Sequence, residues 1–200
     1  IYDQLGDARR IHVHRQLGEA LETLADPDAH VEALAHHFAQ AAADGQGLKA
    51  STYALAAGRR ATARLGYEEA ARHYERGLQA LTLTGQSQDQ RRCELLLDLG
   101  EARWGAGELD KARQAYGQAA ELADKLGDAT ALAHAALGFC GPHLAAAAVA
   151  RPISELLQRA LATIDGNDSP LRAQLMGRVA AYTEIEHKAA LASEALAMAR

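Results

Sequence analysis

Residues 99–119 read LGEARWGAGELDKARQAYGQA, and this stretch decides the fold. Small residues and a tyrosine recur in it at fixed spacing: Gly100 precedes Ala112 by 12 residues, and Ala112 precedes Tyr116 by four. A glycine-rich turn at 105–107 separates the two halves, so the stretch predicts two helices folded back on each other. Small side chains let such helices approach closely, and the tyrosine is expected to fill the space toward the next helix pair.

The same pattern occurs upstream, in residues 58–74. Gly58 precedes Ala70 by 12 residues, and Ala70 precedes Tyr74 by four, as in the first stretch. The two copies are offset by 42 residues. The usual period of such helix-turn-helix repeats is about 34 residues, and the polar linker 84–89 accounts for the difference. Repetition of this kind predicts stacked helix hairpins that shelter one another's apolar faces.

This pattern resembles the tetratricopeptide repeat (TPR), and residues 99–119 are its better copy. The resemblance implies an all-α, right-handed solenoid of stacked antiparallel hairpins whose inner surface binds a ligand. The first copy departs from the pattern at Gly77, where alanine is usual. The structural positions of the repeat are Gly58, Ala70, Tyr74, Leu99, Gly100, Gly107, Ala112, Tyr116 and Ala119.

Apolar residues recur at helical spacing along nearly the whole chain, and strand-favouring valine and isoleucine are scarce. We predict ten helices in a single TPR-like domain over residues 1–200, with Asp26 capping the second helix and the eighth helix starting after Pro152. The chain begins without methionine and ends inside a helical pattern, so we expect a piece of a larger protein. The predicted hairpins span about 6–43, 48–83, 90–126, 129–164 and 170–200.

The charge balance argues against two kinds of partner. The formal net charge is −5 and the isoelectric point is near 6.0, whereas nucleic-acid binders usually carry a basic surplus. No apolar run approaches the roughly 18 residues of a membrane span. Cys93 and Cys140 lie far apart in the sequence. We interpret them as small buried residues of a protein in the reducing cytoplasm.

A second resemblance covers nearly the whole chain. The segments that carry it are 9–22, 34–38, 67–76, 91–101 and 168–173. They are similar to the region that follows the ATPase and winged-helix parts of large bacterial ATP-binding regulators of the LuxR type and their signalling relatives. The resemblance implies the sensor or interaction arm of such a regulator. No GxxxxGK[ST] motif occurs, so this segment is expected to hold no cofactor, and any ATP site would lie upstream of it.

Alignment with the TPR pattern also predicts which residues line the inner surface. Trp104, the only tryptophan, falls one position past the usual buried aromatic residue of the first helix. It either faces the groove or packs beneath the next hairpin. A mixed apolar and charged lining suits a peptide, a partner helix or a small-molecule inducer. The predicted lining consists of Thr52, Leu55, Arg59, Thr62, Glu94, Leu97, Glu101 and Trp104.

The sequence offers no catalytic motif, and we predict neither an enzyme nor a metal site. Nine histidines raise the question of metal binding, but none has a recognised ligand spacing. His36 and His37 are adjacent on a predicted helix, so we expect that they cannot both face one site. The alternatives to a regulator arm are a free-standing adaptor, whose groove binds another protein, and an enzyme or metal protein.

Overall fold

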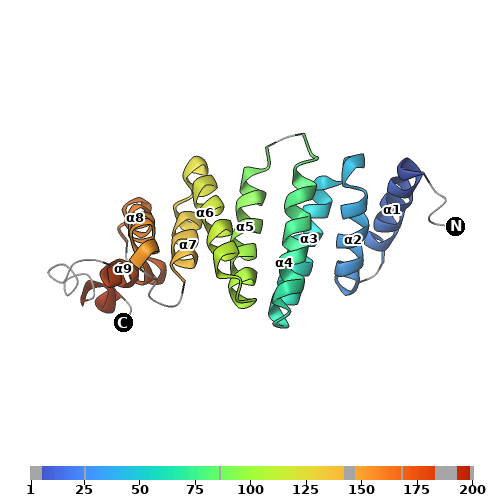
Figure 1. Ribbon diagram of the computed structural model, residues 1–200. Coiled ribbons are helices and arrows are strands. Elements are labelled where there is room, and N and C mark those ends of the chain that lie inside the picture. The colour runs from blue at the N-terminus through green and yellow to red at the C-terminus, as the bar shows by residue number, and fades with distance from the viewer. Residues whose placement is uncertain are drawn as a thin grey trace. The chain divides into compact units, whose positions relative to one another are not determined.

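The computed structural model describes residues 6–24, 26–85, 87–141, 147–167, 169–182 and 193–198, and within these ranges every regular element is a helix (Figure 1). The chain divides into two compact units, Ile1–Glu108 and Leu109–Arg200. The first unit contains α1 (Asp7–Glu22), α2 (Val31–Gln40), α3 (Gly47–Ala63), α4 (Tyr67–Leu81) and α5 (Asp89–Gly105), with short 3-10 helices η2 (Pro27–His30) and η3 (Ala42–Asp44) beside α2. The second contains α6 (Leu109–Leu126), α7 (Ala129–Cys140), α8 (Ala147–Thr163), α9 (Pro170–Tyr182) and a helical turn at 193–198.

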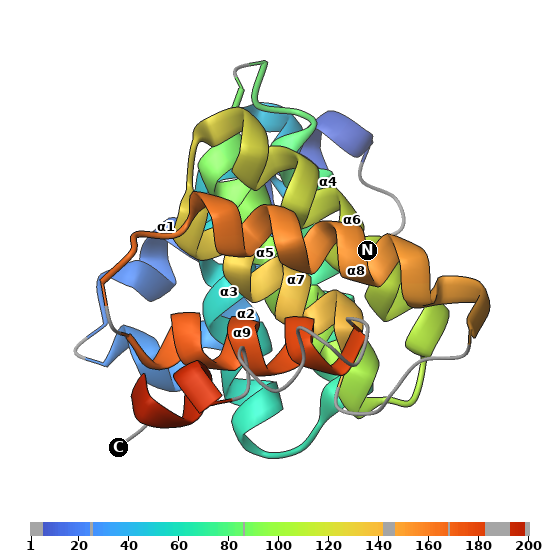
Figure 2. The same ribbon diagram turned by 90° about the vertical axis from the view of Figure 1, so that its left-hand side faces the viewer.

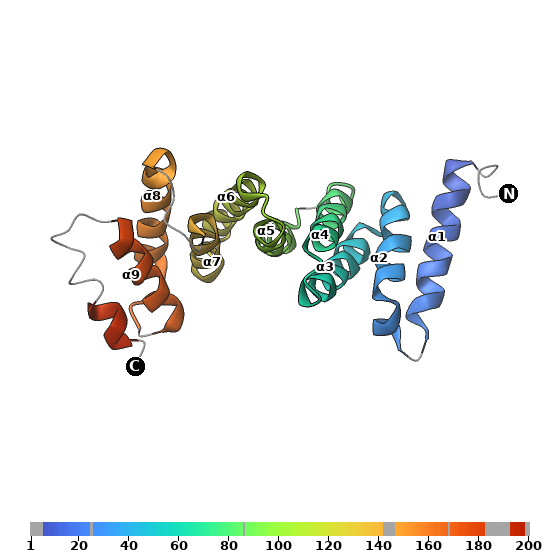
Figure 3. The ribbon, with the colours of Figure 1, turned by 60° about the horizontal axis from the view of Figure 1, so that its bottom comes forward.

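The first unit is a row of helices in which each helix packs against the next one in sequence. α1 lies beside α2, α2 beside α3, α3 beside α4 and α4 beside α5, with short connections that reverse the chain (Figures 1 and 3). α3 and α5 also touch each other. The unit therefore consists of stacked antiparallel hairpins, because each helix pair buries its apolar stripe against its neighbours.

The repeat glycine and tyrosine of the first copy are in direct contact. Tyr74 on α4 is fully buried, and its ring lies against the backbone of Gly58 on α3. A β-carbon at residue 58 would lie 2.2 Å from Cε1 of Tyr74, closer than any real contact. Gly77 has a similar role, since a β-carbon there would meet Ala54 on one side and Leu95 on the other at 3.0–3.1 Å. These glycines let α4 lie close to both α3 and α5.

The core at the start of the chain centres on a fully buried aromatic residue, Phe38. Its ring stacks on Tyr53 with a centroid distance of 5.4 Å and an interplanar angle of 10°. On the other side the ring meets α1 at Gly18, where a β-carbon would lie 2.9 Å from Cζ. Phe38 thus joins α1, α2 and α3. The residues packed around it include Leu34, Ala42, Ala50, Ala80 and Leu21.

The second unit has the same construction. α6 packs against α7, α7 against α8, and α8 against α9 (Figure 2). The buried Tyr116 of α6 lies against Gly138 of α7, where a β-carbon would be 2.3 Å from Cε1. Tyr116 therefore fills the space toward the next hairpin, as the sequence predicted. Among the described residues of this unit, the fully buried large apolar side chains include Leu132, Ile153, Leu157, Leu175 and Met176.

Most helix boundaries lie within a few residues of their predicted positions, with two differences. The second helix opens with η2, and the Asp26 carboxylate accepts a hydrogen bond from the backbone N–H of Ala29 at 3.2 Å. The expectation that the eighth helix follows Pro152 is wrong, because α8 begins at residue 147 and contains this proline. Pro152 is the sixth residue of α8 and therefore lies past its first turn, where a proline removes one backbone hydrogen bond and strains the helix. The predicted break at 184–187 lies outside the described residues, and the single domain stays a prediction.

The repeat positions occupy the places that the pattern indicated. Gly107 adopts a left-handed conformation with φ of +76° and makes the turn after α5. The remaining repeat positions are buried: Gly58, Ala70, Tyr74, Leu99, Gly100, Ala112, Tyr116 and Ala119.

Candidate functional site

The predicted lining residues lie on α3 and α5, which are in contact within the first unit. Spacings of three and four residues place Arg59 and Thr62 near one another along α3, and Glu94, Leu97 and Glu101 along α5. Arg59 and Glu101 are exposed, whereas Thr62, Glu94 and Leu97 are half-buried. Two neighbouring helices therefore share a mixed polar and apolar surface, which we call the α3–α5 face. Its described members are Thr52, Arg59, Thr62, Arg91, Glu94, Leu97, Asp98, Glu101 and Trp104.

One predicted lining residue does not belong to this surface. Leu55 is only 4% exposed and is part of the core, so its assignment to the inner surface is wrong. The exposed stripe of α3 passes instead through Thr52, Ala56, Arg59 and Ala63. Trp104 is half-buried near the end of α5, and its role in binding stays a prediction.

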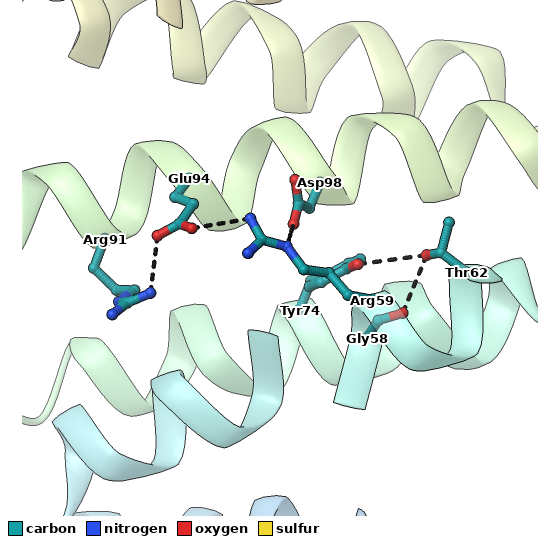
Figure 4. Close-up of polar contacts among 7 residues, drawn as sticks. All are labelled: Gly58, Arg59, Thr62, Tyr74, Arg91, Glu94 and Asp98. Atoms are coloured by element: carbon teal, nitrogen blue, oxygen red, sulfur yellow. Dashed lines mark hydrogen bonds and ion pairs between the residues drawn. The ribbon is translucent and has the colours of Figure 1, made fainter. Parts of the chain in front are cut away.

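The centre of the face is an ion-pair network around Arg59 (Figure 4). Arg59 reaches from α3 to α5, where its Nε donates to Oδ2 of Asp98 at 2.7 Å and its Nη2 donates to Oε1 of Glu94 at 2.9 Å. The other carboxylate oxygen of Glu94 accepts from Nη1 of Arg91 at 2.8 Å. One guanidinium thus holds two carboxylates in a defined orientation, while 54% of its side chain remains open to solvent.

Sequence reasoning missed Arg91 of this network and also Asp98. It follows Glu94 by four residues and precedes Glu101 by three, which places three carboxylates along one stripe of α5. This spacing was visible in the sequence. The cation that pairs with Glu94 and Asp98, however, is Arg59 of another helix, 39 residues away from Asp98.

The electrostatics of Asp98 show that the network is not a simple stabilising bridge. Burial raises the pKa of the Asp98 carboxyl above its usual value, and the hydrogen bond from Arg59 only partly offsets this effect. The side chain is only 21% exposed, so desolvation has the largest effect on its pKa. A raised pKa means that the folded protein disfavours the charged carboxylate relative to the unfolded chain. In the folded state, burial therefore works against the charged form of Asp98, and Arg59 works in its favour.

We expect the substitution Asp98→Asn to leave the melting temperature at pH 7 unchanged or slightly higher. The amide removes the disfavoured charge, and Arg59 keeps its partner Glu94. Since the folded-state pKa is raised, the unfavourable contribution is present above that pKa and disappears as the pH falls through it. The difference between variant and wild type should therefore shrink on acidification. Thermal melts from pH 7 to pH 4 would check this, and a large loss of stability at pH 7 would contradict it.

Thr62 and Tyr74 lie next to this network (Figure 4). The Thr62 hydroxyl donates to the carbonyl oxygen of Gly58 at 3.1 Å and lies 3.4 Å from the Tyr74 hydroxyl. Burial raises the pKa of Tyr74 to about 12, so the phenol stays protonated at neutral pH. Tyr74 thus packs on Gly58 and also contacts Thr62 of the α3–α5 face.

A second cluster of polar side chains lies between α1 and α2. The rings of His14, His36 and His37 have centroids 5.1–5.5 Å apart. Their candidate ligand atoms all lie within 4.8 Å of one another. The expectation that the adjacent His36 and His37 cannot face one site is therefore wrong, because both side chains can turn toward a third residue on α1.

The two cysteines are buried thiols, as their sequence context predicted: Cys93 lies on α5 and Cys140 at the end of α7. Among the described residues, no helix is long and apolar enough to cross a membrane.

Two solved structures of a kinesin light chain-like protein from Podosopora anserina, built of nearly identical TPR-like repeats, are similar to this chain. One, a variant form, aligns with a TM-score of 0.60 and 14% identity over 96% of this chain and 93% of that chain. The chain has a TPR-like fold. The other structure aligns with a TM-score of 0.54 and 14% identity, covering 96% of this chain and 90% of that chain. No protein-family model and no curated protein matches this TPR-like sequence.

Proposed function

We propose that this TPR-like chain is a non-catalytic interaction module and that its α3–α5 face binds a segment of a protein partner. The observation that carries the proposal is the geometry around Asp98: Arg59 holds this half-buried carboxylate and that of Glu94 in a defined orientation, on a surface open to solvent. Groups with a perturbed pKa, such as Asp98, are more common at binding sites than in ordinary structural positions.

The composition of the face indicates the chemistry of the partner. Glu101 is exposed and forms no ion pair with any described residue, so it is available to a basic side chain. Leu97 and Trp104 next to it are partly exposed and offer apolar contact. An extended or helical segment that carries one basic and one large apolar side chain would satisfy both.

We expect Trp104→Ala to weaken partner binding on the order of 2 kcal/mol, which is about 30-fold in Kd. Aromatic side chains at the centre of an interface contribute this much because they exclude water from a large area. The probe is a peptide selected against the protein from a displayed library of random short peptides. Binding is measured by titration calorimetry, and circular dichroism checks that helix content is unchanged.

Leu83→Ala is the matched control, since Leu83 is an exposed apolar residue that lies outside α3 and α5. Its affinity should equal that of the wild type. If the wild type and Trp104→Ala bound the peptide with equal affinity, Trp104 would not be part of the binding site. If the selected peptides carried no basic residues, Glu101 would not bind a basic side chain of the partner.

We further propose that the module is the sensor or interaction arm of a larger ATP-dependent regulator in the bacterial cytoplasm. The support is the sequence resemblance carried by residues 9–22, 34–38, 67–76, 91–101 and 168–173. In this arrangement the bound segment belongs to a partner or to another domain of the same chain, and a small-molecule inducer would compete for the face. Any bound ATP would lie in an upstream domain, and nucleic acid would be contacted only by other parts of the parent.

The full-length gene product separates this proposal from a free-standing adaptor. A nucleotide-binding motif encoded upstream of residue 1 would support the regulator arm. A start codon directly before residue 1 would instead favour an adaptor with the same binding face.

A further inference from the structure

The histidine cluster of the first hairpin lies outside the α3–α5 face and has a different chemistry. His14 comes from α1 and is buried, while His36 and His37 come from α2 and are exposed and half-buried. Nδ1 of His14 lies 2.8 Å from Nδ1 of His37, so the two rings share one proton in a hydrogen bond. Three imidazoles from two helices thus converge on one point that solvent reaches through His36.

The packing of α1 against α2 fixes this convergence. Gly18 follows His14 by four residues, so both lie on the same side of α1. The ring of Phe38, the residue after His37, fits against Gly18 at a distance that leaves no room for a side chain. The two helices are therefore in close contact within one turn of the cluster. The contact between Phe38 and Gly18 thereby holds the three histidines near one another.

The pKa values of two histidines in this cluster are lowered. Burial lowers the pKa of His14, and the positive charge of His36 lowers it further. Burial lowers the pKa of His37 as well, with additional contributions from His14 and His36. Burial thus favours the neutral form of His14 and His37, which is the form of imidazole that ligates metals.

We propose that His14, His36 and His37 bind a divalent zinc ion, with water as the fourth ligand. Zinc–nitrogen bonds of about 2.0–2.1 Å in tetrahedral geometry place two ligand nitrogens about 3.3 Å apart. The closest pair of ring nitrogens is 2.8 Å apart, and the whole set lies within 4.8 Å. Small side-chain rotations therefore suffice to form the site. The ion takes the place of the proton that His14 and His37 share.

Zinc at this position would link α1 to α2 and stabilise the first hairpin. Any ligand that binds only the folded state stabilises it by mass action, so melting should shift upward with zinc concentration. This role is independent of partner binding on the α3–α5 face.

The test is a zinc titration of the full chain, without a polyhistidine tag, at pH 7.5 by calorimetry, with thermal melts in parallel. We expect one zinc ion per chain and an increase in melting temperature. His36→Gln and His14→Gln should each lower the affinity on the order of 100-fold, because loss of a direct ligand exceeds the 10–100-fold effect of outer contacts. Cobalt in place of zinc should give the visible absorption of a tetrahedral site.

His12→Gln is the matched control. His12 is exposed on the same helix, two residues from His14, and its Nδ1 lies 3.2 Å from a guanidinium nitrogen of Arg15 instead. This variant should bind zinc like the wild type. His36 is exposed, so His36→Gln should fold normally even if His14→Gln does not. Equal zinc affinities of the wild type and His36→Gln, or no stoichiometric binding at all, would overturn the proposal and leave a hydrogen-bonded histidine pair.

Discussion

Gly58→Ala should destabilise the protein by about 2 kcal/mol, although alanine is normally the better helix residue by about 1 kcal/mol. The added methyl group would lie 2.2 Å from Cε1 of Tyr74, so the ring or the helix must move. The same substitution in a Tyr74→Leu background should be neutral or stabilising, because the shorter side chain leaves room for the methyl group. Urea denaturation of the four proteins measures this coupling.

Gly177→Ala provides the control for this experiment. Gly177 lies in the middle of α9, and a β-carbon there would meet no atom within 4 Å. Alanine at this position should stabilise the protein by up to about 1 kcal/mol through helix propensity alone. If Gly58→Ala were as stabilising as Gly177→Ala, the contact between the repeat glycine and tyrosine would not hold the hairpin together.

Phe38→Ala should be the most damaging core substitution in the first unit, with a loss of about 3–5 kcal/mol in the free energy of unfolding. The ring is fully buried, stacks on Tyr53 and fits against Gly18, so its removal leaves a cavity at the meeting point of three helices. Thermal and urea denaturation would measure the loss.

Phe139→Ala is the natural comparison, since the chain contains only two phenylalanines. Phe139 is half-buried on α7, and the same truncation should cost less than half as much there. Similar losses for the two variants would mean that Phe38 is not the joint between α1, α2 and α3.

The architecture could be predicted because it depends on local periodicity. The spacing of Gly58, Ala70 and Tyr74 defines a hairpin within 17 residues, and helix breakers mark its ends. The same reasoning misplaced the start of α8, because it took Pro152 as a helix start, whereas α8 runs through this proline. Local patterns thus identify hairpins well and their ends less well.

The composition of the candidate site depends on how helices lie side by side, which a single sequence does not specify. Leu55 and Ala56 are both compatible with the stripe of Arg59 at helical spacing, and only the packing of α3 shows that Leu55 turns inward. Asp98 acquires its role from Arg59, 39 residues away. The three histidines meet because Gly18 allows α1 to approach Phe38 closely, which is a property of two helices and not of either one.

The stability of the fold and the chemistry of its face are separate features of this chain. The rings packed on glycines are apolar and buried, whereas the network around Arg59 is partly solvated. Exposed or half-exposed ion pairs typically contribute no more than about 1 kcal/mol, so the network has little influence on folding. We therefore attribute its defined geometry to the recognition that we propose for the α3–α5 face.

The most direct test of this account is to map the binding face by nuclear magnetic resonance. Isotope-labelled protein would be titrated with the selected peptide, and the shifted backbone and indole signals would be assigned. The account predicts that the largest changes occur on α3 and α5, at Arg59, Glu94, Glu101 and the indole of Trp104. Changes confined to α2 and α4, with these four residues unaffected, would contradict it.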